Sequence, residues 1–263
     1  MTATLEIRQR GAHVVEVWLN RPDVRNAFNQ DVIAELRATF ETLAENADLR
    51  VVVLGGRGKA FCAGADLSWM REMASYDWDQ NRADALALAD MLWVIYNCPV
   101  PVVARIQGDC YAGGVGLAAV CDVRVASQGV QFCLSEARLG LLPATISPYV
   151  VRAMGEQPSR RYFVTAERFD AEQARTMGLV HEVCDAQALD ERVDDIVQTI
   201  AANGPLAVRA CKRLVLDVAG LPIDQPLREE TARRIADIRA SQEGREGIQS
   251  FLHKRKPAWL EAQ

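Results

Sequence analysis

The sequence predicts an α/β fold followed by a helical C-terminal region. Short apolar segments that suit strands alternate with longer amphipathic segments in the first half of the chain. Two glycine-rich turns each link a strand to a helix, and the pattern is helical after about residue 185. With 263 residues, the chain is long enough to bury one large core or two small ones. We therefore expect a core over residues 1–185 and a helical region over residues 186–263.

The elements of the first half follow from the spacing of apolar side chains. Short β-branched or alternating runs predict strands, and apolar residues that return to one face every 3.6 residues predict amphipathic helices. The expected strands lie at 5–9, 14–19, 51–54, 102–106 and 123–126, the first two forming a hairpin. The expected helices lie at 30–44, about 67–72 and about 81–96, the last ended by Pro99 and Pro101.

The C-terminal region is predicted to contain helices at 188–201, 206–218 and 226–239. In the first of them, Leu189, Val193, Ile196 and Ile200 form one apolar stripe. Pro205 is well placed in the first turn of the second helix. No Ser/Gly-rich linker separates the two halves of the chain.

Composition and charge narrow the class of protein. Hydrophobic residues make up 49% and charged residues 25%, which is typical of a soluble globular protein. The net charge of −5 argues against broad binding to nucleic acid or to anionic membranes. The first residues lack a basic-then-apolar signal, and the apolar runs are too short to span a bilayer. We therefore expect a cytoplasmic protein with no nucleic-acid or membrane partner.

The cysteines and histidines do not suggest a metal or redox site. The seven cysteines show no Cys-x-x-Cys spacing and have apolar neighbours, which favours reduced, buried thiols. His13, His181 and His253 are scattered, so we expect no metal site. The sequence contains no Walker or Rossmann glycine spacing, so we also expect no nucleotide cofactor.

Residues 108–136 are the most informative part of the chain. Gly108, Gly113, Gly114 and Gly116 lie beside a small apolar run, and Glu136 follows twenty residues later. Because glycines have no Cβ atom, their N–H groups can come close to a ligand. A second such turn, at residues 59–66, follows the strand at 51–54. Taken singly, each glycine-rich turn could simply be a tight turn that packing requires. Two amide donors and one carboxylate together have a more specific use. They suit a reaction that makes an anion on oxygen and moves a proton on carbon.

Together these segments resemble the enoyl-CoA hydratase/isomerase (crotonase) family over essentially the whole chain. The residues that carry the resemblance are Leu19-Asn-Arg-Pro22, Asn26-Ala27, Ala60-Phe-Cys-Ala-Gly-Ala-Asp66, Gly113-Gly114, Ala118, Cys121-Asp122, Phe132, Glu136, Gly178-Leu-Val180, Phe251 and Lys254-Arg-Lys-Pro257. The resemblance implies a spiral of ββα units whose C-terminal helices make trimer contacts. It also implies an acyl-CoA thioester substrate, so that coenzyme A is part of the substrate rather than a cofactor. A homotrimer or a dimer of trimers is the implied assembly.

The resemblance places the chemistry at a few positions. The amides of Ala65 and Gly113 are implied to bind the thioester oxygen, and Glu136 is implied to transfer the proton. The implied substrate-lining residues are Ala63, Ala65, Asp66, Leu67, Ser68, Gly113 and Gly116. A structural role for Glu136 is the alternative, because an acidic residue after a Ser135 cap would stabilise the first turn of a helix.

Gly116 stands where the family's hydratases commonly carry a second glutamate. Its absence removes a second base and a negative charge, so a substrate with its own distal carboxylate would be better tolerated. Arg138 could pair with such a carboxylate, or it could be an ordinary surface charge. Asp109 could replace the missing base, although a role in stabilising the turn is the simpler interpretation.

Other segments point to CoA binding and to a subfamily. Arg25, Phe251 and Lys254 match family positions that contact CoA, although both cations could also be plain surface charges. The stretches 143–148 and 161–169 are similar to bacterial methylglutaconyl-CoA hydratases of leucine breakdown and to isohexenylglutaconyl-CoA hydratases of acyclic-terpene breakdown. The resemblance therefore implies reversible syn addition of water to the 2,3 double bond of a branched, carboxylated enoyl-CoA.

Two other functions remain open at this point. A Δ3,Δ2-enoyl-CoA isomerase of the same family can work with one glutamate at the position of Glu136. A non-catalytic trimer that binds acyl-CoA would need no glutamate at all. The acidic composition speaks against RNA binding.

Overall fold

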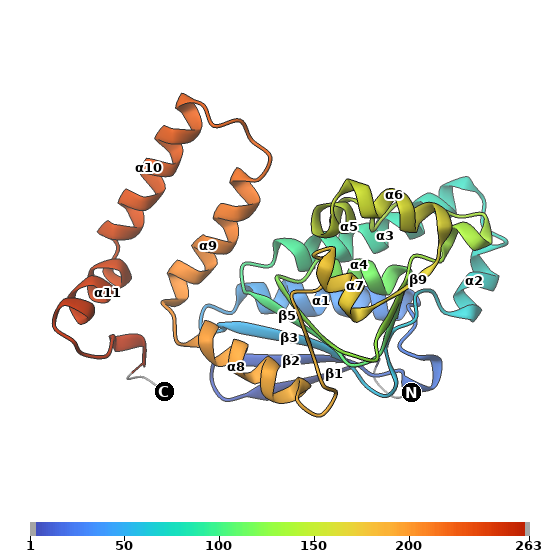
Figure 1. Ribbon diagram of the computed structural model, residues 1–263, viewed down its shortest axis with the longest axis horizontal. Helices are drawn as coiled ribbons and strands as arrows, with labels where there is room; N and C mark the ends of the chain where they lie inside the picture. Colours follow the sequence, from blue (N-terminus) through green and yellow to red (C-terminus); the bar gives the residue numbers. More distant parts are fainter. Residues whose placement is uncertain (1–3, 261–263) are drawn as a thin grey trace. The chain divides into compact units, whose positions relative to one another are not determined.

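The computed structural model describes residues 4–260, which form two compact units. The first unit extends to Val197 and the second begins at Gln198. Figure 1 shows the helices and strands along the chain. The α-helices of the first unit are α1 (Gln30–Glu45), α2 (Leu67–Met73), α3 (Trp78–Asn97), α4 (Gly113–Ala119), α5 (Ser147–Met154), α6 (Glu156–Thr165), α7 (Ala171–Thr176) and α8 (Leu189–Ala201), which continues into the second unit.

A six-stranded sheet with the order β1-β2-β3-β5-β7-β10 forms the centre of the first unit. Its strands are β1 (Leu5–Arg10), β2 (Val14–Leu19), β3 (Val51–Gly56), β5 (Val102–Ile106), β7 (Val123–Ser127) and β10 (Glu182–Cys184). The hairpin of β1 and β2 is antiparallel, as predicted, and every later neighbour is parallel. Because β3 is buried at all six positions, its Val and Leu run forms a strand covered on both faces.

A second sheet of four strands, with the order β4-β6-β8-β9, was not predicted. Its strands are β4 (Ala60–Cys62), β6 (Asp109–Tyr111), β8 (Gln131–Cys133) and β9 (Arg168–Asp170). Each has three residues, which is too short for an alternating pattern to stand out. This sheet matters for function because the glycine-rich turns leave from the ends of β4 and β6.

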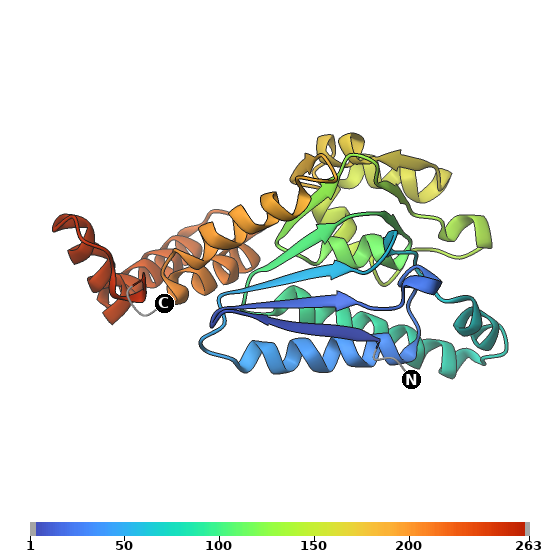
Figure 2. The same cartoon turned by 90° about the horizontal axis from the view of Figure 1, so that it is seen from below.

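The helices α1 and α3 pack against each other on one side of the six-stranded sheet (Figure 2). Asn29 caps α1 by accepting a hydrogen bond from the Val32 amide at 3.0 Å. Helix α3 begins at Trp78, earlier than predicted, because Asp77 and Gln80 form a reciprocal capping box. The α/β class, the five predicted strands and the predicted helices of this unit are confirmed.

The second unit contains α9 (Pro205–Val218), α10 (Gln225–Ala240) and α11 (Gln242–Leu252). Arg234 of α10 pairs with Asp217 of α9 at 2.7 Å. The carboxylate of Glu243 accepts hydrogen bonds from the Leu206 and Ala207 amides, so α11 supplies the cap of α9. The two units divide at Val197, within α8. The boundary that we expected at 185 instead coincides with the end of the last strand, β10, at Cys184. Leu189, Val193 and Val197 of α8 are buried.

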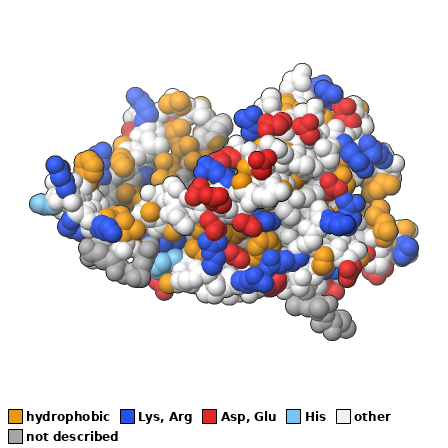
Figure 3. Space-filling view, turned by 60° about the horizontal axis from the view of Figure 1, so that its bottom comes forward, with side chains coloured by type: hydrophobic (Ala, Val, Ile, Leu, Met, Phe, Trp, Pro, Cys, Tyr) orange, Lys and Arg blue, Asp and Glu red, His pale blue; other side chains and the backbone are white. Residues whose placement is uncertain are grey.

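Charged side chains of both signs are intermixed on the molecular face shown in Figure 3. Partly exposed ion pairs of the protein include Arg10 with Asp194, at 2.6 Å. Exposed pairs of this kind contribute about 0–1 kcal/mol each, so they do not determine the fold.

Candidate active site

The Ala65 amide is held in place by the main chain of Phe28. The Phe28 amide donates to the Gly64 carbonyl at 2.6 Å, and the Asp66 amide donates to the Phe28 carbonyl at 2.7 Å. In an extended segment, successive peptide groups point to opposite sides, so these two bonds direct the N–H of Ala65 away from Phe28. Within residues 4–260, the Ala65 amide donates to no protein oxygen.

The Gly113 amide is also unpaired within the described residues. Gly113 is the first residue of α4, where no intrahelical carbonyl is available to its N–H. Ala112 precedes it with φ at 48° and ψ at −120°, a positive-φ conformation outside the left-handed helical region that is costly for a residue with a Cβ atom. The conformation of Ala112 sets the direction of the chain at the start of α4, and so it orients the Gly113 amide.

The structure brings the two glycine-rich turns together. A Cβ atom placed on Gly64 would lie 3.8 Å from the Gly113 nitrogen and 2.9 Å from the Ala112 Cβ. A Cβ atom on Gly114 would lie 2.9 Å from the Cβ of Cys62. Only glycine fits at these contacts, and Gly64 also has φ at 89°. The close packing therefore depends on the glycines that the sequence singled out.

Asp66 has a structural role through its side chain. One carboxylate oxygen accepts from the Ser68 amide and hydroxyl and caps α2, and the other pairs with Arg21 at 2.7 Å. Burial acts to raise the pKa of Asp66, but the hydrogen bonds from Ser68 and Arg21 outweigh it and leave the pKa below its ordinary value. Arg21 also donates to the Ala27 carbonyl, so it ties the segment of Ala27 and Phe28 to the turn that contains Ala65.

The other predicted lining residues lie along the same turn. Ala63 is half-buried and its amide donates to the Arg25 carbonyl at 3.1 Å. Leu67 and Ser68 begin α2 and are exposed. Leu67 therefore presents an apolar side chain to the exterior two residues after Ala65.

Glu136 is a half-buried carboxylate with an unsatisfied oxygen. It begins η2 (Glu136–Leu139), and its Oε2 atom is buried without a hydrogen-bond partner among the described residues. Burial raises the pKa of Glu136 above its ordinary value. The Ser135 side chain makes no capping hydrogen bond, so the alternative of a capped helix start is not supported.

One hydrogen bond connects the segment of Glu136 to the segment of Gly113. The Ala112 amide donates to the Cys133 carbonyl at 2.8 Å, one residue before Gly113 and three before Glu136. The neighbouring pair Tyr111 and Cys133 is in register between β6 and β8. The turn that ends in the Gly113 amide and the turn that carries Glu136 thus leave from adjacent strands.

The space beside Gly116, where the missing glutamate side chain would lie, is occupied by Ile146. A Cβ atom placed on Gly116 would lie 2.6 Å from the Cβ of Ile146, and Ile146 is only 1% exposed. Gly113 and Gly116 are three residues apart on α4 and therefore lie on the same face of the helix. An apolar side chain, rather than open space for a substrate carboxylate, covers this position.

Arg138 and Asp109 both have partners within the protein. Arg138 donates from Nη2 to the Ala166 carbonyl at 2.6 Å. Asp109 forms an ion pair with Arg25. Asp109 is therefore engaged by a cation, which weakens the alternative that it replaces the missing base. Arg25 also lies 5.9 Å from the centre of the Tyr111 ring.

Phe251 and Lys254 belong to the second unit. Phe251 is 82% exposed near the end of α11, and Lys254 follows that helix with φ at 53°. Their role in CoA binding stays a prediction.

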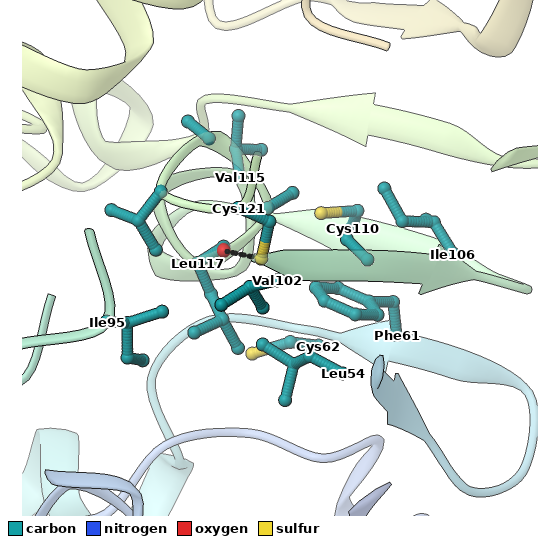
Figure 4. Packing of buried hydrophobic residues seen from close by; sticks show 14 of the residues in the cluster. Leu54, Phe61, Cys62, Ile95, Val102, Ile106, Cys110, Val115, Leu117 and Cys121 are labelled. Carbon is teal, nitrogen blue, oxygen red and sulfur yellow. Dashed lines mark hydrogen bonds between the residues drawn. The ribbon is translucent and has the colours of Figure 1, made fainter. Parts of the chain in front are cut away.

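Buried cysteines and apolar side chains pack beneath α4 (Figure 4). The Cys121 thiol donates to the Leu117 carbonyl at 3.3 Å, and burial raises the pKa of Cys62 to about 12. Such thiols are packing groups rather than nucleophiles.

In the part of the chain that the structure covers, no cluster of His, Cys, Asp or Glu could hold a metal ion. No helix between residues 4 and 260 is both long and apolar enough to cross a membrane.

Comparison with known proteins gives consistent matches over nearly the full length. The profile of a family described as "Enoyl-CoA hydratase/isomerase" matches residues 9–262. The enoyl-CoA hydratase ACTT6 of Alternaria alternata is 34% identical over 91% of this chain and 78% of its own. The 2,3-dehydroadipyl-CoA hydratase of Escherichia coli is 31% identical over 95% of this chain and 96% of its own. The crystal structure of an enoyl-CoA hydratase from Shewanella pealeana superposes with a TM-score of 0.94 at 39% identity, covering 97% of this chain and 96% of that one.

Proposed function

Because the chain belongs to the enoyl-CoA hydratase/isomerase family, we propose that it adds water to the 2,3 double bond of an enoyl-CoA. The α/β fold that the resemblance implied is shared with solved structures of this family. The observation that carries the proposal is the buried, unpartnered Oε2 of Glu136, on a segment hydrogen-bonded next to Gly113. A general acid/base needs such an oxygen free to face its substrate.

In the proposed reaction, the thioester oxygen lies between the amides of Ala65 and Gly113. Glu136, as the carboxylate, removes a proton from water while the water oxygen bonds to C3. The electrons of the double bond move onto the thioester oxygen, where the two amides stabilise the enolate. Each such donor contributes about 3–4 kcal/mol in enzymes where one has been removed. The protonated Glu136 then delivers its proton to C2 on the same face, which completes a syn addition and regenerates the carboxylate.

The raised pKa of Glu136 supports this double role. A carboxyl group whose pKa lies closer to neutrality gives up and takes back a proton with less difference in free energy. One residue can therefore act first as base and then as acid.

For the substrate, we propose a branched, carboxylated acyl chain of the 3-methylglutaconyl-CoA or isohexenylglutaconyl-CoA type. The E. coli relative is named for 2,3-dehydroadipyl-CoA, which has a distal carboxylate, and this supports the class. Arg138 uses one nitrogen for the Ala166 carbonyl and retains other N–H donors for a carboxylate. We also propose a homotrimer or a pair of trimers, which sedimentation of the purified protein tests.

A Δ3,Δ2-enoyl-CoA isomerase is the second candidate, and the packing of Ile146 favours it specifically. With Ile146 packed on Gly116, no second carboxylate can lie at that position, and the side chain that covers it is apolar. Glu136 alone would remove a proton from C2 of a 3-enoyl-CoA and return it to C4, while the double bond moves to C2–C3. This reaction needs no bound water.

Incubation in H₂¹⁸O separates the candidates. The protein is given crotonyl-CoA, 3-methylglutaconyl-CoA and a 3-enoyl-CoA in turn, and the products are examined by mass spectrometry. Incorporation of ¹⁸O into a 3-hydroxyacyl-CoA supports the hydratase, with a higher kcat/KM for 3-methylglutaconyl-CoA supporting the carboxylated class. Conversion of the 3-enoyl-CoA to a 2-enoyl-CoA without ¹⁸O supports the isomerase. Binding without turnover of any of them would leave a non-catalytic acyl-CoA-binding protein.

A further inference from the structure

We infer that Phe28 is a positioning residue that holds the amides of Ala65 and Gly113 in one arrangement. The inference rests on the proposed function, in which these amides bind the thioester oxygen. Phe28 contacts both turns, one through its main chain and the other through its ring. The sequence motifs drew attention to the glycines and not to this residue.

The main-chain contact fixes the first donor. Phe28 donates to the Gly64 carbonyl at 2.6 Å and accepts from the Asp66 amide at 2.7 Å. These bonds bracket Ala65, so any displacement of Phe28 moves the Ala65 amide with it. The neighbouring Asn29 caps α1, which anchors Phe28 to the start of a sixteen-residue helix.

The ring contact fixes the second donor. A Cβ atom placed on Gly113 would lie 3.0 Å from Cε2 and 3.1 Å from Cδ2 of the Phe28 ring. The ring therefore packs directly on the Cα atom of Gly113, at the residue whose amide is the other candidate donor. Phe28 is only 1% exposed, so its ring is enclosed and has little freedom to move.

These two contacts make Phe28 a rigid spacer between the donors. An oxyanion site depends on donors that are fixed before the charge develops, and small displacements are costly to the rate. Removing the ring leaves the amides in the chain but lets the start of α4 shift relative to Ala65. A purely structural role in the core would lower stability without this effect on the bound thioester.

The first test compares Phe28→Leu and Phe28→Met with Phe40→Leu. Phe40 is a fully buried phenylalanine eleven residues further along from Asn29 in α1, about 16 Å away along the helix. We expect kcat for a 2-enoyl-CoA to fall at least tenfold in Phe28→Leu, with KM changed less than threefold. The kcat of Phe28→Met should lie between those of the wild type and Phe28→Leu. Phe40→Leu is expected to lower the melting temperature comparably while kcat stays within twofold. Equal effects of Phe28→Leu and Phe40→Leu on kcat would overturn the inference.

The second test does not require turnover. Butyryl-CoA labelled with ¹³C at the thioester carbonyl is bound, and the infrared stretching frequency of that carbonyl is measured. We expect a shift to lower frequency in the wild type and in Phe40→Leu, and a smaller shift in Phe28→Leu. A full shift in Phe28→Leu would overturn the inference and leave the proposed function standing. No shift in the wild type would overturn the donor site itself, and the inference with it.

A third test uses the contact between the two residues. Gly113→Ala places a methyl group against the Phe28 ring, whereas Leu at position 28 gives it room. We expect Gly113→Ala to lower kcat by a larger factor in the wild-type background than in Phe28→Leu. Equal factors in the two backgrounds would show that the ring does not act on Gly113.

Discussion

Ile146 occupies the space that a side chain on Gly116 would need, since a Cβ atom there would lie 2.6 Å from the Cβ of Ile146. The two residues come from α4 and from the turn that precedes α5, and both are buried. A buried apolar side chain therefore replaces, in this chain, the carboxylate that the resemblance led us to look for at Gly116. The site is left with Glu136 as its candidate acid and base.

Gly116→Glu is expected to destabilise the fold. Overpacking of a close-packed core costs about 1–3 kcal/mol, and burial of a carboxylate adds to this cost. Gly129→Glu is the matched control, because nothing lies within 4 Å of a Cβ atom placed on Gly129. Urea unfolding of both variants at neutral pH measures the difference. A Gly116→Glu variant as stable as Gly129→Glu would contradict the packing described here.

The double variant Gly116→Glu/Ile146→Gly is expected to accept the carboxylate and to change specificity. With Ile146 reduced to glycine, the glutamate would add a negative charge on the face of α4 that carries Gly113, and this charge would repel the distal carboxylate of a glutaconyl-type substrate. Like charges about 4 Å apart repel by about 4 kcal/mol at an effective dielectric of 20. The ratio of kcat/KM for crotonyl-CoA over 3-methylglutaconyl-CoA should therefore rise relative to Ile146→Gly alone. An unchanged ratio would reject a substrate carboxylate near Gly116.

Gly113→Val is expected to reduce activity more than Ala65→Gly does. Valine places a branched side chain against the Phe28 ring, where even a Cβ atom would lie at 3.0 Å. Ala65→Gly keeps the N–H group and adds only backbone freedom, which costs about 0.5–1 kcal/mol at most. Steady-state kinetics of both variants, with circular dichroism to confirm folding, measure the order. The reverse order would place the oxygen of the thioester elsewhere.

The buried carboxyl of Glu136 is expected to make stability depend on pH. Because burial raises its pKa in the folded state, the native protein binds more protons than the unfolded chain between the ordinary value of 4.5 and the raised value. The free energy of unfolding contributed by Glu136 therefore falls as pH rises through this window. Glu136→Gln removes that contribution, so its stability relative to wild type should increase as the pH rises above 4.5. A stability difference that does not change with pH would mean that the pKa is not raised.

Most of the main sheet could be predicted from sequence, because its signals are local. The hairpin of β1 and β2 and the buried run of β3 follow from apolar side chains within each segment. The strands β4, β6, β8 and β9 could not be predicted, since three-residue strands acquire their identity from partners far along the chain. Helices α5 to α7 were also missed, although the Asp170–Gln173 capping box that starts α7 is a signal the sequence contains.

The candidate site likewise has features that the local sequence predicts and features that it does not. Gly64, Gly113 and Glu136 could be singled out because glycine-rich turns and a lone carboxylate are visible in the sequence. The packing of Ile146 on Gly116 and of Phe28 on Gly113 could not, because each joins segments that are distant in sequence. The partners of Arg138 and Asp109, Ala166 and Arg25, are also distant in the chain. The roles of Arg25, Phe251 and Lys254 in CoA binding remain predictions.

The central claim is that Glu136 transfers the proton in hydration, and the kcat of Glu136→Gln tests it most directly. Hydration is measured with the best enoyl-CoA substrate found, alongside Glu156→Gln, whose side chain is 78% exposed, as the control. Removing a general acid/base typically lowers the rate by about 10²–10⁴. We expect a loss of this size in Glu136→Gln, with nearly unchanged binding of the CoA ester and an unaffected Glu156→Gln. A kcat for Glu136→Gln within a few-fold of the wild type would contradict the account.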